Sequence, residues 1–142
     1  MERDWKRFPI DHAAAAHRPA GDTLVNVPTR FFTATPAAQV LPARVILGMK
    51  VVVTARATSW TWRFGDDTSL ATSSPGAPDS DAVTHAYLAA GSVRPRVDVT
   101  YTATYTIGDV PTALPAEGTT TIPGAATAPL RVREARSELD AA

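Results

Sequence analysis

The sequence predicts an all-β fold built from two packed sheets, and three observations lead to this prediction. Polar and apolar residues alternate in several short stretches, as they do in strands that bury one face. Twelve prolines, eight glycines and many threonines and valines suit short strands joined by turns. The length of 142 residues fits one domain, which would bury about two-thirds of its unfolded surface.

The expected strands follow one another without an internal repeat, so a single sandwich domain is predicted over residues 23–136. An N-terminal arm of residues 1–22 precedes it, and a polar tail of residues 137–142 follows it. The expected strands, in chain order, are residues 24–27, 30–33, 45–56, 60–64, 97–107, 119–122 and 130–135.

The aromatic strand at residues 60–64 is expected to be central to the core. Trp60, Trp62 and Phe64 occupy every second position, so their side chains share one face. Burying each of them contributes roughly 1.5–3 kcal/mol. Gly65 and Asp66 then begin a turn, because glycine tolerates any φ and aspartate accepts hydrogen bonds from nearby backbone N–H groups.

The stretch before the aromatic strand alternates between two faces and is expected to form one long strand, residues 45–56. Within it, Gly48 is expected to mark a bulge. Residues 57–58 are short enough to be a hairpin link into the aromatic strand. After that strand, residues 70–82 show no periodicity and predict a long surface loop.

The longest regular pattern lies at residues 97–107, where alternate apolar side chains keep one phase. Pro95 cannot donate to a ladder, so this strand should begin at an edge or a bulge. Residues 119–122 are expected to return beside it as an extra C-terminal hairpin. The side chains in phase are Val97, Val99, Tyr101, Ala103, Tyr105 and Ile107.

Two segments together resemble the PKD domain, an Ig-like β-sandwich module. That family has an aromatic-x-Phe-Gly-Asp-Gly turn, then His-x-Tyr and a glycine before its next strand. Here Asp67 stands where the family has glycine, and aspartate is among the less costly residues at positive φ. Tyr87 also resembles the tyrosine corner of Ig-like sandwiches, whose hydroxyl bonds to backbone. The residues that match the motif in order are Trp62, Phe64, Gly65, Asp66, His85, Tyr87 and Gly91.

Other stretches resemble one group of PKD proteins from high-GC Gram-positive bacteria. The group has a Pro-x-x-Phe-Phe/Tyr segment before the core, as at residues 28–32. It also has a Val-x-Tyr-x-x-x-Tyr strand, as at residues 99–105, and an Arg-Val-x-Glu-Ala ending, as at residues 131–135. The resemblance implies a module that binds, spaces or displays, and no catalytic activity.

Charge and composition argue against several classes of partner. Fourteen basic and fourteen acidic residues cancel, so no basic excess favours nucleic acid. No stretch approaches the roughly 20 apolar residues of a membrane span. No apolar run suits a secretory signal, since the longest near the start is residues 13–16.

No catalytic site and no cofactor are expected. His12 and His17 lie outside the expected sandwich, and His85 belongs to the corner motif, where packing and hydrogen bonding explain it. Four carboxylates are a calcium candidate, because Ca²⁺ takes six to eight oxygen ligands from such loops. The alternative, which we favour, is that the first caps its own turn and the others are solvated. The four are Asp66, Asp67, Asp79 and Asp81.

The N-terminal arm carries the expected interaction site. Trp5, Phe8 and Ile10 are too few to form a core of their own, so we expect them to dock on another subunit, a second copy of this chain included. The alternative is a loose terminus.

The predicted function is therefore structural. The resemblance implies a module that works outside cells, yet no export signal is seen. A phage virion protein satisfies both, because it is made in the cytoplasm and released by lysis. We therefore expect a capsid decoration or minor tail protein of actinobacteriophage type. The alternative is a secreted or cell-envelope PKD protein that adheres to a protein or a host-surface glycan. An accessory domain of a secreted hydrolase is a third reading.

Overall fold

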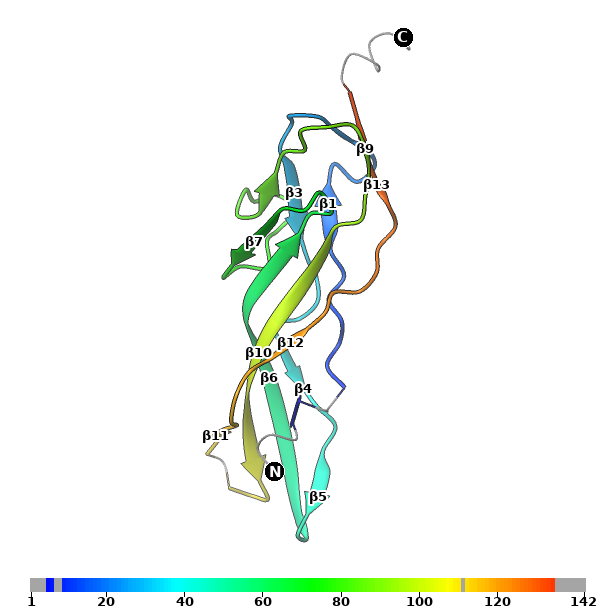
Figure 1. Ribbon diagram of the computed structural model, residues 1–142. Helices are drawn as coiled ribbons and strands as arrows, with labels where there is room; N and C mark the ends of the chain where they lie inside the picture. The colour runs from blue at the N-terminus through cyan, green and yellow to red at the C-terminus, as the bar shows by residue number, and fades with distance from the viewer. Residues whose placement is uncertain (1–4, 7–8, 111, 135–142) are drawn as a thin grey trace.

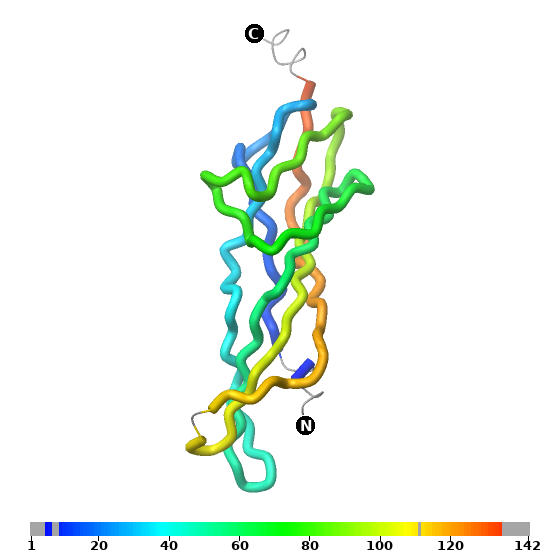
Figure 2. Tube along the Cα trace, turned by 90° about the vertical axis from the view of Figure 1, so that its left-hand side faces the viewer, coloured from blue at the N-terminus to red at the C-terminus, as the bar shows by residue number. Residues whose placement is uncertain are grey.

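The computed structural model describes residues 5–6, 9–110 and 112–134. These residues form an elongated all-β sandwich, which confirms the predicted fold class (Figure 1). The described chain begins near the lower end of the rod, and its last strand reaches the upper end. Figure 2 shows the same rod from the side, with two long strands running through much of its length.

The largest sheet has the order β11–β10–β6–β4, with β12 also paired to β10, and both β5 and β7 paired to β6. Its strands are β4 (Ala38–Val40), β5 (Arg44–Ile46), β6 (Met49–Arg63), β7 (Ser69–Thr72), β10 (Arg96–Ile107), β11 (Leu114–Pro115) and β12 (Thr120–Ile122).

Two small sheets lie at the upper half of the rod (Figure 1). One has the order β1–β3–β8, made of β1 (Ala16–Arg18), β3 (Thr29–Phe32) and β8 (Thr84–His85). The other has the order β2–β13–β9, made of β2 (Thr23–Leu24), β13 (Leu130–Arg133) and β9 (Gly91–Val93).

The prediction of a hairpin link at residues 57–58 is wrong, because β6 runs through this position without a turn. Ser59 pairs with Thr100 and Ala57 with Tyr101, which leaves Thr58 as the extra residue of a β-bulge. Side chains alternate between faces, so one extra residue shifts the phase. The buried positions are accordingly odd-numbered from Val51 to Ala55 and even-numbered from Trp60 onward.

The single strand expected at residues 45–56 is also wrong, because the chain reverses at Leu47 and Gly48. These residues have φ angles of 52° and 76°, so both adopt the left-handed conformation of a two-residue hairpin turn. β5 pairs back on β6, with Ile46 opposite Met49. Gly48 is therefore a turn residue and not a bulge.

Other expectations hold in part. The first residues of the loop expected at residues 70–82 belong instead to β7, which ends at Thr72 and pairs with β6. The strand expected at residues 24–27 shortens to β2, because Asn26 adopts a φ of 64°. The return expected at residues 119–122 is confirmed as β12, which pairs with β10 between Val99 and Tyr101.

The core lies between the sheets and is continuous along the rod. Phe31 of β3 packs against Trp62 and Phe64 of the large sheet, with ring centroids 6.4 and 5.1 Å apart. The alternate side chains of β10 point into this core, as their phase predicts. Its largest fully buried members are Trp5, Trp62, Tyr87, Tyr101, Phe31, Leu130, Val53, Val83, Val97 and Val99.

The N-terminal segment is part of this core, which corrects the expectation of a separate arm. Trp5 and Ile10 are 1% and 6% exposed, and Trp5 Nε1 donates to the Glu117 carbonyl oxygen at 3.0 Å. β1 extends the segment as an edge strand along β3. Apolar side chains that cannot form a core alone have joined the core of their own chain. Phe8 lies outside the described residues, as does the tail of residues 137–142.

Candidate functional site

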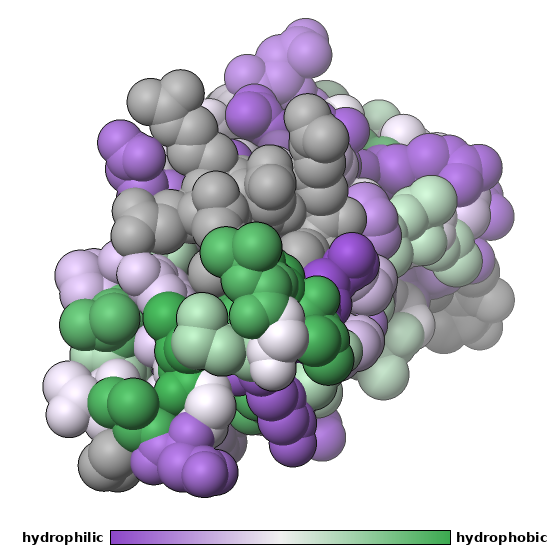
Figure 3. All heavy atoms as spheres, turned by 90° about the horizontal axis from the view of Figure 1, so that it is seen from below, coloured by the Kyte–Doolittle hydropathy of each residue, from purple (hydrophilic) through white to green (hydrophobic). Residues whose placement is uncertain are grey.

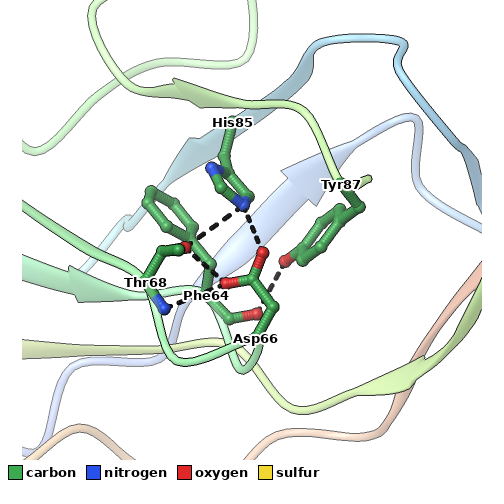
Figure 4. A network of polar contacts seen from close by, with 5 residues as sticks. All are labelled: Phe64, Asp66, Thr68, His85 and Tyr87. Carbon is green, nitrogen blue, oxygen red and sulfur yellow. Dashed lines mark hydrogen bonds and ion pairs between the residues drawn. The ribbon is translucent and has the colours of Figure 1, made fainter. Parts of the chain in front are cut away.

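Four of the motif residues, Phe64, Asp66, His85 and Tyr87, gather at one corner of the sandwich beside Thr68 (Figure 4). Tyr87 donates from its hydroxyl to the Phe64 carbonyl oxygen at 2.8 Å, so it ties the start of the β8–β9 connection to the end of β6. The His85 ring stacks on Phe64, with centroids 4.1 Å apart and planes at 3°, and meets Tyr87 edge-on at 4.7 Å. Burial raises the pKa of the Tyr87 hydroxyl, and the nearby Asp66 charge adds to the effect.

Asp66 is the polar centre of this corner. One carboxylate oxygen accepts from the Thr68 hydroxyl and from the Thr68 N–H at 3.2 Å, and the other lies 2.7 Å from His85 Nε2. Burial alone would raise the pKa of Asp66, but the hydrogen bonds from Thr68 and His85 and the His85 charge outweigh it and lower the pKa. Asp66 therefore caps its own turn, as expected.

The corner is not a nucleophilic relay. A catalytic histidine uses its two ring nitrogens for two different partners, one for the nucleophile and one for the carboxylate. Here the same atom, His85 Nε2, faces both Asp66 at 2.7 Å and the Thr68 hydroxyl at 3.3 Å. The arrangement stabilises a turn between strands from different parts of the chain.

The turn backbone explains the glycine of the motif. Gly65 has a φ of 88°, and a Cβ there would lie 2.8 Å from the Arg94 backbone nitrogen. Asp67, which replaces the family's glycine, has a φ of 67°, so this position does require the left-handed region. Gly91, the last motif residue, begins β9.

The four calcium-candidate carboxylates are not brought together. Asp66 is engaged by Thr68 and His85, and Asp81 binds Arg30 Nε at 2.7 Å. Asp67 and Asp79 are exposed. Among the described residues, no three His, Asp or Glu side chains form a group that could hold a metal ion.

A buried carboxylate that was not expected from the sequence lies beside the core. Asp98 is 6% exposed, and it accepts from Arg63 Nε at 2.7 Å and from the Gly124 N–H at 2.8 Å. Burial would raise the pKa of Asp98, but these hydrogen bonds and the Arg96 and Arg63 charges lower it. The signal was an aspartate inside an apolar strand. Its role is to fix the segment after β12 against β10.

Large aliphatic side chains gather at the lower end of the rod, and we call this surface the apolar end. Figure 3 looks onto it and shows apolar side chains collected there. They come from the β5–β6 hairpin and the β10–β11 connection, the two turns at this end (Figures 1 and 2). Its members are Val45 (75% exposed), Leu47 (92%), Met49 (45%), Val110 (57%) and Leu114 (41%).

Leu47 is unfavourable at its position in two independent ways. Its φ of 52° is costly for a leucine, whereas Asn or Gly would adopt it readily. Its side chain is also the most exposed of the large apolar residues in the described chain. Backbone strain that stability does not explain points to a functional constraint.

The apolar end was not expected from the sequence, because Val45, Leu47 and Met49 look like part of one continuous buried strand. The available signal was the Leu-Gly pair in the middle of that run, which is a variant of the Asn-Gly hairpin turn.

Comparison with known proteins gives one match. A family model described as "PKD domain" matches residues 32–112, which is more than half of the chain. No curated protein and no solved structure matches the chain. Within the described residues, no helix has the length and apolar character needed to cross a membrane.

Proposed function

Because the chain belongs to the PKD domain family, we propose that it is a non-catalytic binding module that joins a protein assembly through its apolar end. PKD domains are in general adhesion or binding modules and are typically not catalytic. The observation that carries the proposal is the cluster of exposed aliphatic side chains around Leu47. Contiguous apolar patches on a protein surface mark interaction sites.

The shape of the apolar end defines the partner surface. A flat contact between stable partners buries about 800 Å² on each side, and the two turns at a narrow tip offer few residues for such a contact. A concave apolar socket on the partner would instead surround Leu47 and its neighbours. The partner is therefore a protein subunit with such a socket.

The setting we propose is a virus particle, with the chain as a capsid decoration or minor tail protein of a phage. An elongated rod with an apolar group at one end suits a subunit that stands on a particle and displays its other end. The alternative is a secreted or cell-envelope adhesion module, which the general role of PKD domains favours. Immunogold labelling of purified particles and of envelope fractions distinguishes the two settings.

The test uses a substitution that removes the apolar anchor and relieves strain. Leu47→Asn places a residue suited to left-handed φ in the turn, so the melting temperature should stay the same or rise slightly. Occupancy of the tagged variant in the purified assembly should fall at least about tenfold relative to the wild type. Leu88→Asn is the matched control, because Leu88 is also exposed, at 82%, and lies outside the apolar end. Wild-type occupancy of the Leu47 variant would remove the basis of the proposal.

A further inference from the structure

Two arginines are register partners on neighbouring strands of the β1–β3–β8 sheet. In the antiparallel β1–β3 pair, Arg18 lies directly opposite Arg30. Like charges at such positions destabilise a sheet, because their Cβ atoms are only about 4.5–5.5 Å apart. Asp81 compensates Arg30 through a 2.7 Å ion pair. In the part of the chain that the structure describes, Arg18 has no ion-pair partner, so one positive charge of the pair is left over.

The uncompensated charge faces a hollow. Arg18, Arg30 and Asp81 line a depression of about 390 Å³ with two prolines. Arg18 also lines a second hollow of about 480 Å³, so it is common to both depressions. The second is lined mainly by small or apolar side chains, with His17 and Thr127 as its other polar members. A site of this kind suits a ligand that combines an acidic group with a narrow, mainly apolar portion.

The second hollow is lined in part by an edge strand. β1 is an edge strand of its sheet, since only β3 pairs with it. The segment after β12 lies beside the chain just before β1, where Ala125 N–H donates to the Ala13 carbonyl oxygen at 2.9 Å. Farther along, Thr127 and Ala128 of the same segment line the hollow together with Ala16 and its β1 neighbours. The hollow therefore borders β1, the strand with which only β3 pairs among the described strands.

We propose that this edge binds a short extended acidic peptide segment of another protein, which adds to β1 as a strand. An edge strand offers unpaired backbone groups, and peptides that add to it gain affinity from main-chain hydrogen bonds. The alanines that line the hollow let a backbone approach closely. A glutamate or aspartate of the peptide meets Arg18 in a charge-assisted hydrogen bond, which balances the arginine pair. This site is separate from the apolar end and does not depend on it.

Fluorescence polarisation with labelled heptapeptides tests the proposal on the full chain. The probe alternates valine and glutamate, and matched peptides replace glutamate by glutamine or lysine. The glutamate peptide should bind saturably and about tenfold more tightly than the glutamine peptide, and the lysine peptide should not bind. A glutamate peptide with alternate backbone amides N-methylated should also fail to bind, because it cannot form the ladder.

Variants of the protein then locate the site. Arg18→Gln should weaken binding of the glutamate peptide about tenfold. Arg131→Gln removes another exposed strand arginine and should change affinity by less than about twofold. Unchanged melting temperatures show that both variants are folded. The proposal is overturned by equal binding of the glutamate and lysine peptides, by equal loss in both variants, or by undiminished binding of the N-methylated peptide. Arg18-dependent binding of polygalacturonate without binding of the glutamate peptide would instead assign the site to an acidic glycan.

Discussion

Replacing Trp5 with alanine should reveal that the N-terminal segment is part of the folded core. The side chain is 1% exposed, and its Nε1 donates to the Glu117 carbonyl oxygen at 3.0 Å, which lies 112 positions away in the sequence. Truncation of a buried tryptophan to alanine costs about 3–5 kcal/mol, because apolar burial is lost and a cavity remains. Typical domains have a free energy of unfolding of about 5–15 kcal/mol, so this loss is a large share.

The assay is urea denaturation followed by far-UV circular dichroism, which does not depend on the tryptophan that is removed. Trp5→Ala should lower the free energy of unfolding by about 3–5 kcal/mol and the melting temperature by about 10–20 °C. Leu88→Ala is the control, since Leu88 is 82% exposed, and it should change stability by no more than about 0.5 kcal/mol. A loss of stability for Trp5→Ala within the control range would show that the N-terminal segment does not contribute to the stability of the fold.

Three further substitutions test the polar contacts and one close approach. Asp66→Ala should lower the free energy of unfolding by about 1–2 kcal/mol at pH 7, with no response of the melting temperature to EDTA. Asp98→Asn should cost about 1–3 kcal/mol, because a carboxylate that serves Arg63 and a backbone N–H is lost. Both carboxyl groups have a lowered pKa in the folded chain, so the stability they add is present above their ordinary pKa and is lost as pH falls through the lowered value. Gly124→Ala should cost about 1–3 kcal/mol, since its Cβ would lie 2.4 Å from the Val97 carbonyl oxygen, whereas Gly21→Ala meets no atom within 4 Å.

Urea titrations at pH 7 and pH 3 check the two aspartate variants. The wild type should lose more stability than either variant between these pH values, and parallel losses in all three proteins would contradict the pKa directions. An EDTA-induced fall in melting temperature that Ca²⁺ restores would show that the acidic side chains bind calcium after all. For the glycines, equal stability of the two alanine variants would contradict the close approach at Gly124.

The turn around Asp66 could be predicted from the sequence, because its determinants are local. Asp66 accepts from Thr68 two residues away, and the left-handed φ of Asp67 follows from its place in a short turn. Tyr87 was expected to bond to backbone, but its partner, the Phe64 carbonyl oxygen, lies 23 positions away. Only packing of the two strands selects that partner.

The apolar end could not be predicted, because exposure is not a local property. Val45 and Met49 show the same alternation as buried strand residues, and the alternation does not say whether another sheet covers them. The structure leaves both uncovered, since the hairpin they form projects from the end of the rod (Figure 1). The hollows beside Arg18 could not be predicted either, because only strand pairing decides the register that sets Arg18 opposite Arg30.

The sequence by itself determined the strand class and the phase of the long strands, since side-chain alternation is a property of each strand alone. It also placed a break between two strand patterns at residues 57–58. Whether that break is a turn or a bulge depends on the partner strand, and β10 continues opposite both halves of β6, so it is a bulge. The place of Trp5 was likewise settled only by the tertiary structure. A short apolar segment gains burial from any core within reach, and the core within reach was that of its own chain.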